Sequence, residues 1–306
     1  METLNNSVAK IVFPTDFTDL AMNALKVAVK MCKRHNASLH LVHTVELDYY
    51  SFSIEPYSSS VYSNQEVLDA SKVNLQRLKE EIELKEGIPC YVHVEPGNPA
   101  HYICSVASEE VADLIIMATH GASGFREFFI GSNAYKVVKH APCPVLTIPG
   151  SFKKASFDKI LFPIRDISGI EEKYEVVKTS FIQKDTLLEV TGIVDKNRPD
   201  QITKISNSLS KLKLRMVDEH INFRSDLYYA TNIANDIIKI ARDKEVDLLA
   251  INASLDYNWR EMFIGPYAQQ IVNHAQIPVL SFRPLLEQPT VNKMTHYSSS
   301  DPLANA

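Results

Sequence analysis

The residues best placed for chemistry lie where a short apolar run meets a loop of small residues and then a helix start. The run from Leu114 to Ala118 is closed by His120-Gly121, which is typical of a strand buried on both faces of a parallel sheet. Gly131-Ser132-Asn133 then opens a helical pattern. Unpaired N–H groups and the positive end of the helix dipole meet at such a helix start, so this stretch predicts an anion site.

The loop itself favours close approach of a ligand. Gly121, Ala122, Ser123 and Gly124 offer little side-chain bulk, so a phosphate chain has room to lie against the backbone. The alternative reading is that these small residues serve only tight packing.

This stretch resembles the nucleotide loop of the universal stress protein family. In the ATP-binding branch of that family the pattern is Gly, two residues, Gly, nine residues, Gly, and then Ser or Thr. Here Gly121 and Gly131-Ser132 have that spacing, and Ala118 stands in place of the first glycine. The APCPV sequence after the helix also fits the family. The resemblance implies a Rossmann-like fold, of the adenine nucleotide alpha hydrolase-like kind, that binds ATP or a related adenine nucleotide, with or without Mg²⁺.

The resemblance also implies roles for residues in four segments. Pro14-Thr15-Asp16 would flank the nucleoside, and the backbone of Thr44 would meet the adenine edge. Ribose and phosphates would lie against a third set, which comprises Met117, Ala118, Gly121, Gly131, Ser132 and Asn133. For Asp16 the alternative is a cap on the first helix. Arg126 and Glu127 recur later in the chain, so a structural or solvated role is favoured for both.

Neither a catalytic nor a metal centre is predicted. His40 and His43 are expected to share one face of a strand, without a third ligand at metal-binding spacing, so structural roles are favoured. The chain has no Gly-x-x-x-x-Gly-Lys-Ser/Thr phosphate loop and no Gly-x-Ser-x-Gly nucleophile elbow.

Composition argues for a cytoplasmic protein with about two domains. The chain has 306 residues, 45% hydrophobic and 23% charged, and a net charge of -5 that gives no reason to expect nucleic-acid or membrane binding. No apolar run approaches the ~20 residues of a membrane span, and the N-terminal sequence does not look like a secretory signal. The cysteines are far apart and predict reduced, mostly buried thiols, with a redox sensor as the alternative: Cys32, Cys90, Cys104 and Cys143.

Strands and helices alternate through the first half, which predicts a parallel α/β sheet with helices on both faces. The predicted strands are residues 10–14, 38–45, 89–95, 114–118 and 145–148. Helix starts are expected at Thr18, at a capping box of Ser63 with Glu66, and at Asn98 followed by proline.

The second half repeats the first. Lys159-Ile160-Leu161-Phe162-Pro163 repeats the first strand, and REFFIG at Arg126 recurs as REMFIG at Arg260, an offset of 134 residues that holds to the end of the repeat. A capping box of Ser168 with Glu171 and helices near 202–212 and 233–241 are expected here. We therefore predict two tandem five-stranded domains, 1–150 and 157–285, and a polar tail, 286–306.

The resemblance thus extends over nearly the whole chain and suggests a tandem universal stress protein. Family domains usually pair through their last strands, here 144–148 and 278–282, so the fusion would form an intramolecular pseudo-dimer. The second domain is expected not to bind nucleotide, because Leu255 replaces Gly121, Pro266 replaces Ser132, and Ile164-Arg165 replaces Thr15-Asp16.

The predicted function is a stress-response or regulatory module that binds an adenine nucleotide in its first domain. The alternatives are a nucleotide-free protein-interaction module and a slow ATP hydrolase. Homo-oligomerisation is left open.

Overall fold

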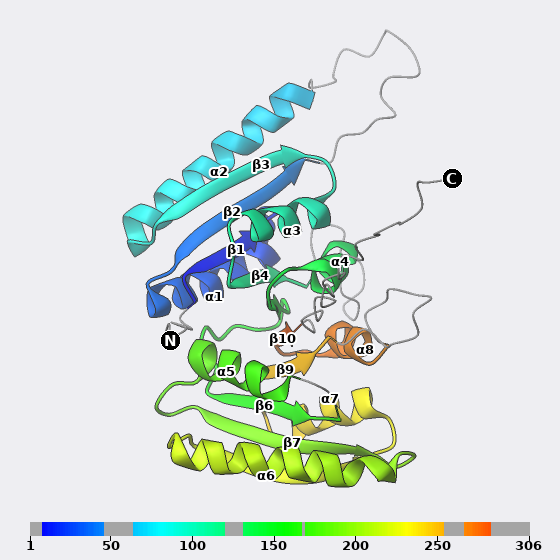
Figure 1. Cartoon of the computed structure of the whole chain (residues 1–306). Helices are drawn as coiled ribbons and strands as arrows, with labels where there is room; N and C mark the ends of the chain where they lie inside the picture. The colour runs from blue at the N-terminus through cyan, green and yellow to red at the C-terminus, as the bar shows by residue number, and fades with distance from the viewer. Residues whose placement is uncertain (1–7, 46–63, 120–130, 167–168, 254–265, 283–306) are drawn as a thin grey trace, which may run out of the picture.

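The protein, seen in a computed structural model, is built on one ten-stranded sheet with helices on both faces (Figure 1). The structure describes residues 8–45, 64–119, 131–166, 169–253 and 266–282. Gly121, Arg126 and Glu127 lie outside these ranges, as does Ser63 of the predicted capping box.

The described part of the first half contains nine elements: β1 (Lys10–Pro14), α1 (Asp19–His35), β2 (Ser38–Val45), α2 (Asn64–Glu86), β3 (Cys90–Pro96), α3 (Pro99–Glu109), β4 (Leu114–Ala118), α4 (Ser132–His140) and β5 (Val145–Ile148). Two predicted caps are confirmed. The Thr18 side chain accepts from the N–H of Ala21, and Asn98 accepts from the N–H of His101.

The second half follows the same order: β6 (Lys159–Ile164), α5 (Ile170–Phe181), β7 (Leu187–Asp195), a short 3₁₀ helix (Pro199–Gln201), α6 (Ile202–Asp218), β8 (Phe223–Ala230), α7 (Ile233–Asp243), β9 (Leu248–Asn252), α8 (Pro266–His274) and β10 (Val279–Phe282). Ser168 of the second predicted capping box lies outside the described residues. Gly169, at φ 73°, is the N-cap of α5 and supplies no side-chain bond.

The strand order is β3-β2-β1-β4-β5-β10-β9-β6-β7-β8, so each half has the same internal order and the two last strands meet in the middle. Pairing is parallel within each half and antiparallel between β5 and β10, with Leu146 opposite Leu280. The Thr147 hydroxyl donates to the Val279 carbonyl at 3.2 Å. The strands that the sequence predicted to pair are therefore neighbours.

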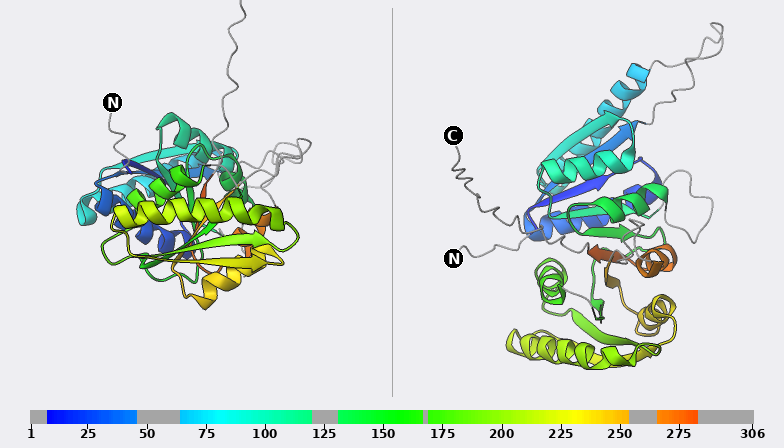
Figure 2. Two further views of the ribbon diagram at one scale, coloured as in Figure 1. Left: turned by 60° about the horizontal axis from the view of Figure 1, so that its bottom comes forward. Right: turned by 45° about the vertical axis from the view of Figure 1, so that its right-hand side comes forward.

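Two apolar layers hold the helices against the sheet, one on each face. Alternate strand residues such as Ile11 and Phe13 pack with α1, α2, α5 and α6, while residues such as Val12 and Leu161 pack with α3, α4, α7 and α8. The two views in Figure 2 show these helices on either side of the sheet in both halves.

Helical elements of the two halves also contact each other. The guanidinium of Arg34, at the end of α1, donates to the carbonyl oxygens of Phe181 at 3.1 Å and Ile182 at 2.6 Å. These are carbonyls at the C-terminus of α5, which have no partner within the helix, so α1 satisfies them across the junction.

Two further predictions from the sequence concern membrane-spanning segments and the state of the cysteines. No helix within the described ranges combines the length and apolar character needed to cross a membrane. No disulfide joins the four cysteines, and burial raises the pKa of Cys32 and of Cys90 to about 12, which keeps both thiols protonated and poorly reactive.

Candidate functional site

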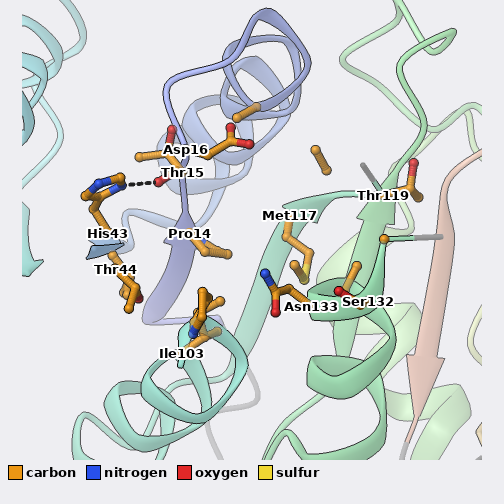
Figure 3. A pocket seen from close by; sticks show the side chains of 16 residues that line it. Pro14, Thr15, Asp16, His43, Thr44, Ile103, Met117, Thr119, Ser132 and Asn133 are labelled. Atoms are coloured by element: carbon orange, nitrogen blue, oxygen red, sulfur yellow. Dashed lines mark hydrogen bonds between the residues drawn. The ribbon is translucent and has the colours of Figure 1, made fainter. Parts of the chain in front are cut away.

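A pocket of about 420 Å³ lies at the carboxyl ends of β1 and β4. β1 and β4 are neighbours in the sheet. The strand that follows β1 in the chain, β2, lies on the far side of β1, and the strand that follows β4, β5, lies on the far side of β4, so the strand order reverses between β1 and β4. Ligands of open α/β sheets bind in the crevice at such a switch point. Figure 3 shows the pocket with residues of β1, β2, α3, β4 and α4 around it.

Nine of the ten residues singled out in the sequence line this one pocket: Pro14, Thr15, Asp16, Thr44, Met117, Ala118, Gly131, Ser132 and Asn133. The tenth, Gly121, lies outside the described residues. Sequence reasoning did not assign His43, Ile103 or Thr119 to this pocket, although each lines it.

The turn after β1 places Asp16 at the pocket. Phe17 adopts φ 62°, an unusual conformation for a bulky residue, and its N–H donates to the Thr15 hydroxyl at 3.0 Å. Oδ1 of Asp16 accepts from the N–H of Thr18 at 3.1 Å and from its hydroxyl at 2.6 Å. Asp16 therefore supports the N-cap of α1 and also lines the pocket. Its contacts at the helix start are compatible with a role in ligand binding.

The end of β2 forms the next wall. Nδ1 of His43 is 2.8 Å from the Thr15 carbonyl oxygen, and its ring packs against Phe17 at 4.8 Å between centroids. The Val42 carbonyl accepts from the N–H of Thr15 at 2.9 Å. Backbone groups alternate sides along a strand, so Thr44 also directs its N–H and C=O toward the β1 side, beyond the end of β1.

The end of β4 shows that alanine is compatible with the first motif position. Ala118 is in register with Ile148 of β5, and it is not among the residues with positive φ. Glycine is therefore not required by the backbone there, and what remains of the substitution is one methyl group in the pocket wall.

The N-terminus of α4 faces the same pocket. The N–H of Gly131 donates to the Thr119 carbonyl at 2.7 Å, which ties the helix start to the end of β4. Gly131 is the N-cap and supplies no side-chain bond to the first turn. The first-turn N–H groups belong to Ser132, Asn133 and Ala134, which all line the pocket, so the helix offers donors and a positive dipole end to an anion.

The equivalent crevice of the second half has a different filling. Arg165 follows β6 as Asp16 follows β1, and Tyr267 stands in α8 where Asn133 stands in α4. The guanidinium carbon of Arg165 lies 4.4 Å from the centroid of the Tyr267 ring. This cation–π contact joins two residues whose first-half counterparts, Asp16 and Asn133, line the pocket.

Comparisons with known proteins point to one family. Its profile, described as the universal stress protein family, matches residues 8–149. A universal stress protein of Methanocaldococcus jannaschii is 32% identical over 144 residues, covering 47% of this chain and 83% of its own length. A universal stress protein of Thermus aquaticus is 33% identical over 141 residues, covering 45% of this chain and 96% of its own.

One solved structure is similar over almost the whole chain. It is the crystal structure of a universal stress protein from Archaeoglobus fulgidus, with a TM-score of 0.67 and 18% identity. The similarity covers 92% of this chain and 98% of that one, and at this identity it bears on the fold alone.

Proposed function

The chain belongs to the universal stress protein family, and from that premise we propose that its first half binds ATP or a related adenine nucleotide. The observation that carries the proposal is the pocket at the β1–β4 switch point, which gathers nine of the ten residues that the sequence motifs single out. Its volume of about 420 Å³ falls within the range of roughly 300–1,000 Å³ that is usual for small-molecule sites.

The two sides of the pocket differ in a way that suits a nucleotide. Apolar side chains from Pro14, Val42, Ile103 and Met117 offer a surface for the base and ribose, beside the backbone groups of Thr44. The N-terminus of α4 offers N–H donors to the phosphates. Mg²⁺, if bound, would accompany the phosphates.

We further propose that the chain is a tandem of two domains, 1–150 and 157–285, followed by a tail, 286–306. Arg165 and Tyr267 support a nucleotide-free second domain, because they contact each other and their first-half counterparts line the pocket. The antiparallel β5–β10 pairing supports an intramolecular pseudo-dimer, in which the second domain is a scaffold for the first.

The biological role that fits these features is a nucleotide-dependent stress-response or regulatory module in the cytoplasm. The alternative of a nucleotide-free interaction module has one observation on its side, the methyl group of Ala118 at the glycine position of the motif. Slow ATP hydrolysis is the third candidate.

Calorimetric titration of the purified full chain with ATP tests the proposal, after mass spectrometry has identified any nucleotide that co-purifies. We expect a stoichiometry near one per chain. A value near two, or no binding at millimolar ATP, contradicts the proposal.

A series at Gly131 tests the position of the phosphates. The φ of -59° and ψ of 149° suit any residue, so Gly131→Ala and Gly131→Val should both fold. Added bulk at the helix start should weaken ATP binding modestly in the alanine variant and abolish it in the valine variant. Unchanged affinity in Gly131→Val would remove the phosphates from this helix.

A further inference from the structure

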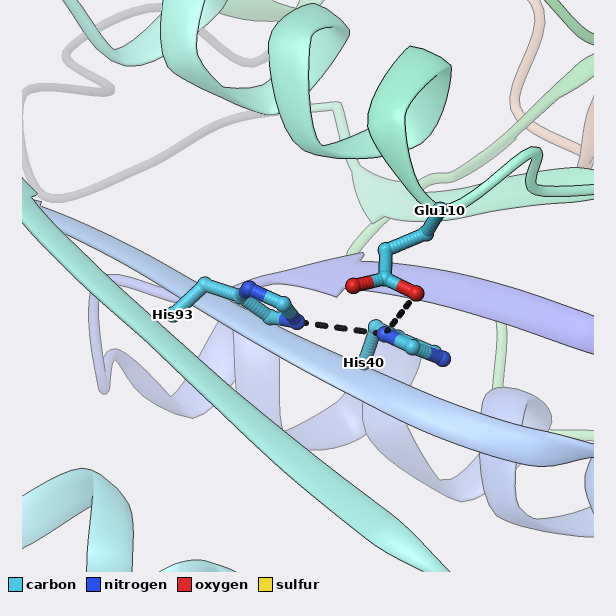
Figure 4. A group of neighbouring side chains, drawn as sticks. All are labelled: His40, His93 and Glu110. Carbon is cyan, nitrogen blue, oxygen red and sulfur yellow. Dashed lines mark hydrogen bonds and ion pairs between the residues drawn. The ribbon is translucent and has the colours of Figure 1, made fainter.

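Three potential metal ligands converge away from the pocket, at the other end of α3. His40 of β2, His93 of β3 and Glu110, the C-cap of α3, lie together on one face of the sheet (Figure 4). Nδ1 of His40 is 3.1 Å from Nε2 of His93 and 3.8 Å from Oε2 of Glu110. The described residues contain no other group of three histidine, cysteine or carboxylate side chains this close.

Sequence reasoning missed this cluster because it placed His40 and His43 on one face. Residues three apart on a strand point to opposite faces, and the structure shows that outcome. His43 packs against Phe17 near α1, while His40 packs beside His93 under α3. The prediction that the two histidines share a face is therefore wrong, and the partners of His40 come from distant positions in the chain.

The distances suit a single ion. Zn²⁺ binds histidine nitrogen and carboxylate oxygen at roughly 2.0–2.2 Å, so donors of one tetrahedral ion lie about 3.3 Å apart. The 3.1 Å separation of the two nitrogens is close to this value. The ligand atoms of all three side chains lie within 4.8 Å of one another, so the Glu110 carboxylate must approach by up to about 1.5 Å, which its partly exposed side chain permits.

The surroundings prepare the two imidazoles for a metal. His40 is buried and His93 is half-buried, so neighbouring elements hold both rings in place beneath α3. Nε2 of His40 is 3.3 Å from the Ser38 hydroxyl, and its ring stacks on Tyr91. Contacts of this kind orient ligand rings in metal sites.

The matching place in the second half contains a built-in cation. Register and repeat offset equate His40, His93 and Glu110 with Glu189, Asp226 and Lys244. Nζ of Lys244 lies 2.6 Å from Glu189 and 2.8 Å from Asp226. The ammonium of Lys244 therefore lies between the carboxylates of two neighbouring strands.

The frame around the two clusters is the same. Lys10 donates to the Glu110 carbonyl at 2.8 Å, and Lys159 donates to the Lys244 carbonyl at 2.8 Å. In the first half the residue at the helix end is the carboxylate of Glu110, where the second half has the ammonium of Lys244. Lys10 also lies 3.3 Å from Oε2 of Glu110 and competes for that carboxylate.

We propose that His40, His93 and Glu110 bind a transition-metal dication of the zinc class, with the remaining coordination position taken by water. Two imidazoles and one carboxylate are a donor set that zinc accepts in proteins. The bound ion would fasten the end of α3 to β2 and β3, as the ammonium of Lys244 fastens the end of α7 to β7 and β8.

The test is Zn²⁺ binding by the full chain, stripped with a chelator and titrated in competition with a chromophoric chelator. One site per chain is expected. His93→Gln and Glu110→Gln, which change partly exposed residues, should each weaken binding at least tenfold. His101→Gln, an exposed histidine of α3, is the matched control and should leave the affinity unchanged. Lys10→Met should tighten binding, because the competing ammonium is gone.

Two further readouts separate this site from other zinc ligands. Zn²⁺ should raise the melting temperature of the parent chain and of His101→Gln, but not of His93→Gln. Co²⁺ should give a ligand-field spectrum without sulfur-to-metal charge transfer. Equal zinc affinity in His93→Gln and His101→Gln, no zinc binding at all, or a thiolate charge-transfer band would each overturn the proposal.

Discussion

The two halves keep the same strand order and the same pattern of buried faces, yet they differ at two places where polar side chains converge. At the crevice, the first half has Thr15, Asp16 and Asn133 around a pocket, and the second has Arg165 stacked on Tyr267. The fold of each half therefore depends on its apolar alternation, while polar positions at the strand ends are free to change without loss of the sheet.

The two halves also differ in side-chain packing beside the crevice, at one position of β2 and the equivalent position of β7. His43 of β2 corresponds by register to Gly192 of β7. A Cβ on Gly192 would lie 2.8 Å from Cδ1 of Leu227 and 3.0 Å from Cγ2 of Ile205, so these neighbours already occupy the space. The second half therefore has no room for the histidine that lines the pocket of the first.

The largest expected effect comes from the junction that joins the halves. Val279 is 2% exposed in β10, beside β5. Val279→Asp buries an unpaired charge and should cost about 4 kcal/mol of unfolding free energy. Because the sheet is shared, urea unfolding should show both halves destabilised. Val217→Asp, at a position 61% exposed on α6, is the control and should cost less than about 0.5 kcal/mol. Loss of only the second half's stability would mean that the halves are energetically independent.

A second comparison concerns how much the Lys244–Glu189–Asp226 cluster and the His40–His93–Glu110 cluster each contribute to the free energy of unfolding. Lys244→Met leaves the buried carboxylate of Glu189 without its ammonium and should cost about 3 kcal/mol in urea unfolding. Arg224, 4.0 Å from Glu189, offsets only part of the loss. In metal-free protein Glu110→Gln should cost about 1 kcal/mol or less, because the ion pair that it breaks, with Lys10, is partly exposed to solvent. Equal losses would show that the two clusters are electrostatically alike.

Introducing the Arg165–Tyr267 pair of the second half into the first-half pocket tests whether such a pair blocks nucleotide binding. Asp16→Arg combined with Asn133→Tyr should place the same cation–π pair across the first pocket. ATP affinity should fall at least 100-fold, which is about 2.8 kcal/mol, while each single change should have a smaller effect. Undiminished ATP binding in the double variant would show that Arg165 and Tyr267 do not explain the difference between the halves.

The smallest effect is expected at the departure from the family motif. Ala118→Gly restores the glycine, yet Ala118 is not at positive φ, so no strain is relieved. ATP affinity measured by calorimetry should change less than about threefold, or ~0.7 kcal/mol. A gain of tenfold or more would show that the alanine methyl obstructs the ligand.

Local rules were sufficient for much of the fold. The apolar runs of β1, β4 and β5 and the caps at Thr18 and Asn98 depend on residues near in sequence, and all are where they were predicted. By contrast, five strands were expected in the second half, but the positions of β7 and β8 were not predicted. Polar residues interrupt β7, and they are satisfied only by partners on other elements, such as Lys244 with Glu189 and Asp226 with Thr191.

The candidate pocket was largely predictable because the family resemblance assigned its segments together. Ile103 and Thr119 were not, since only the packing of α3 and the end of β4 brings them to the pocket. The His40 cluster and the Arg165–Tyr267 contact depend on strand order and on residues far apart in sequence. A single sequence carries no local signal for such pairs, so these needed the structure.

The antiparallel meeting of β5 and β10 also limits how the chain can assemble. Each of these strands has both neighbours inside the same molecule, so no backbone edge is left there for a second copy. A one-domain protein with this strand at its sheet edge could bind one further copy through that edge. Here the edge is paired within the chain, at an effective concentration set by the short linker between the halves. The outer strands of the described sheet are β3 and β8, so among the described strands the free backbone edges lie there, away from the junction that joins the halves.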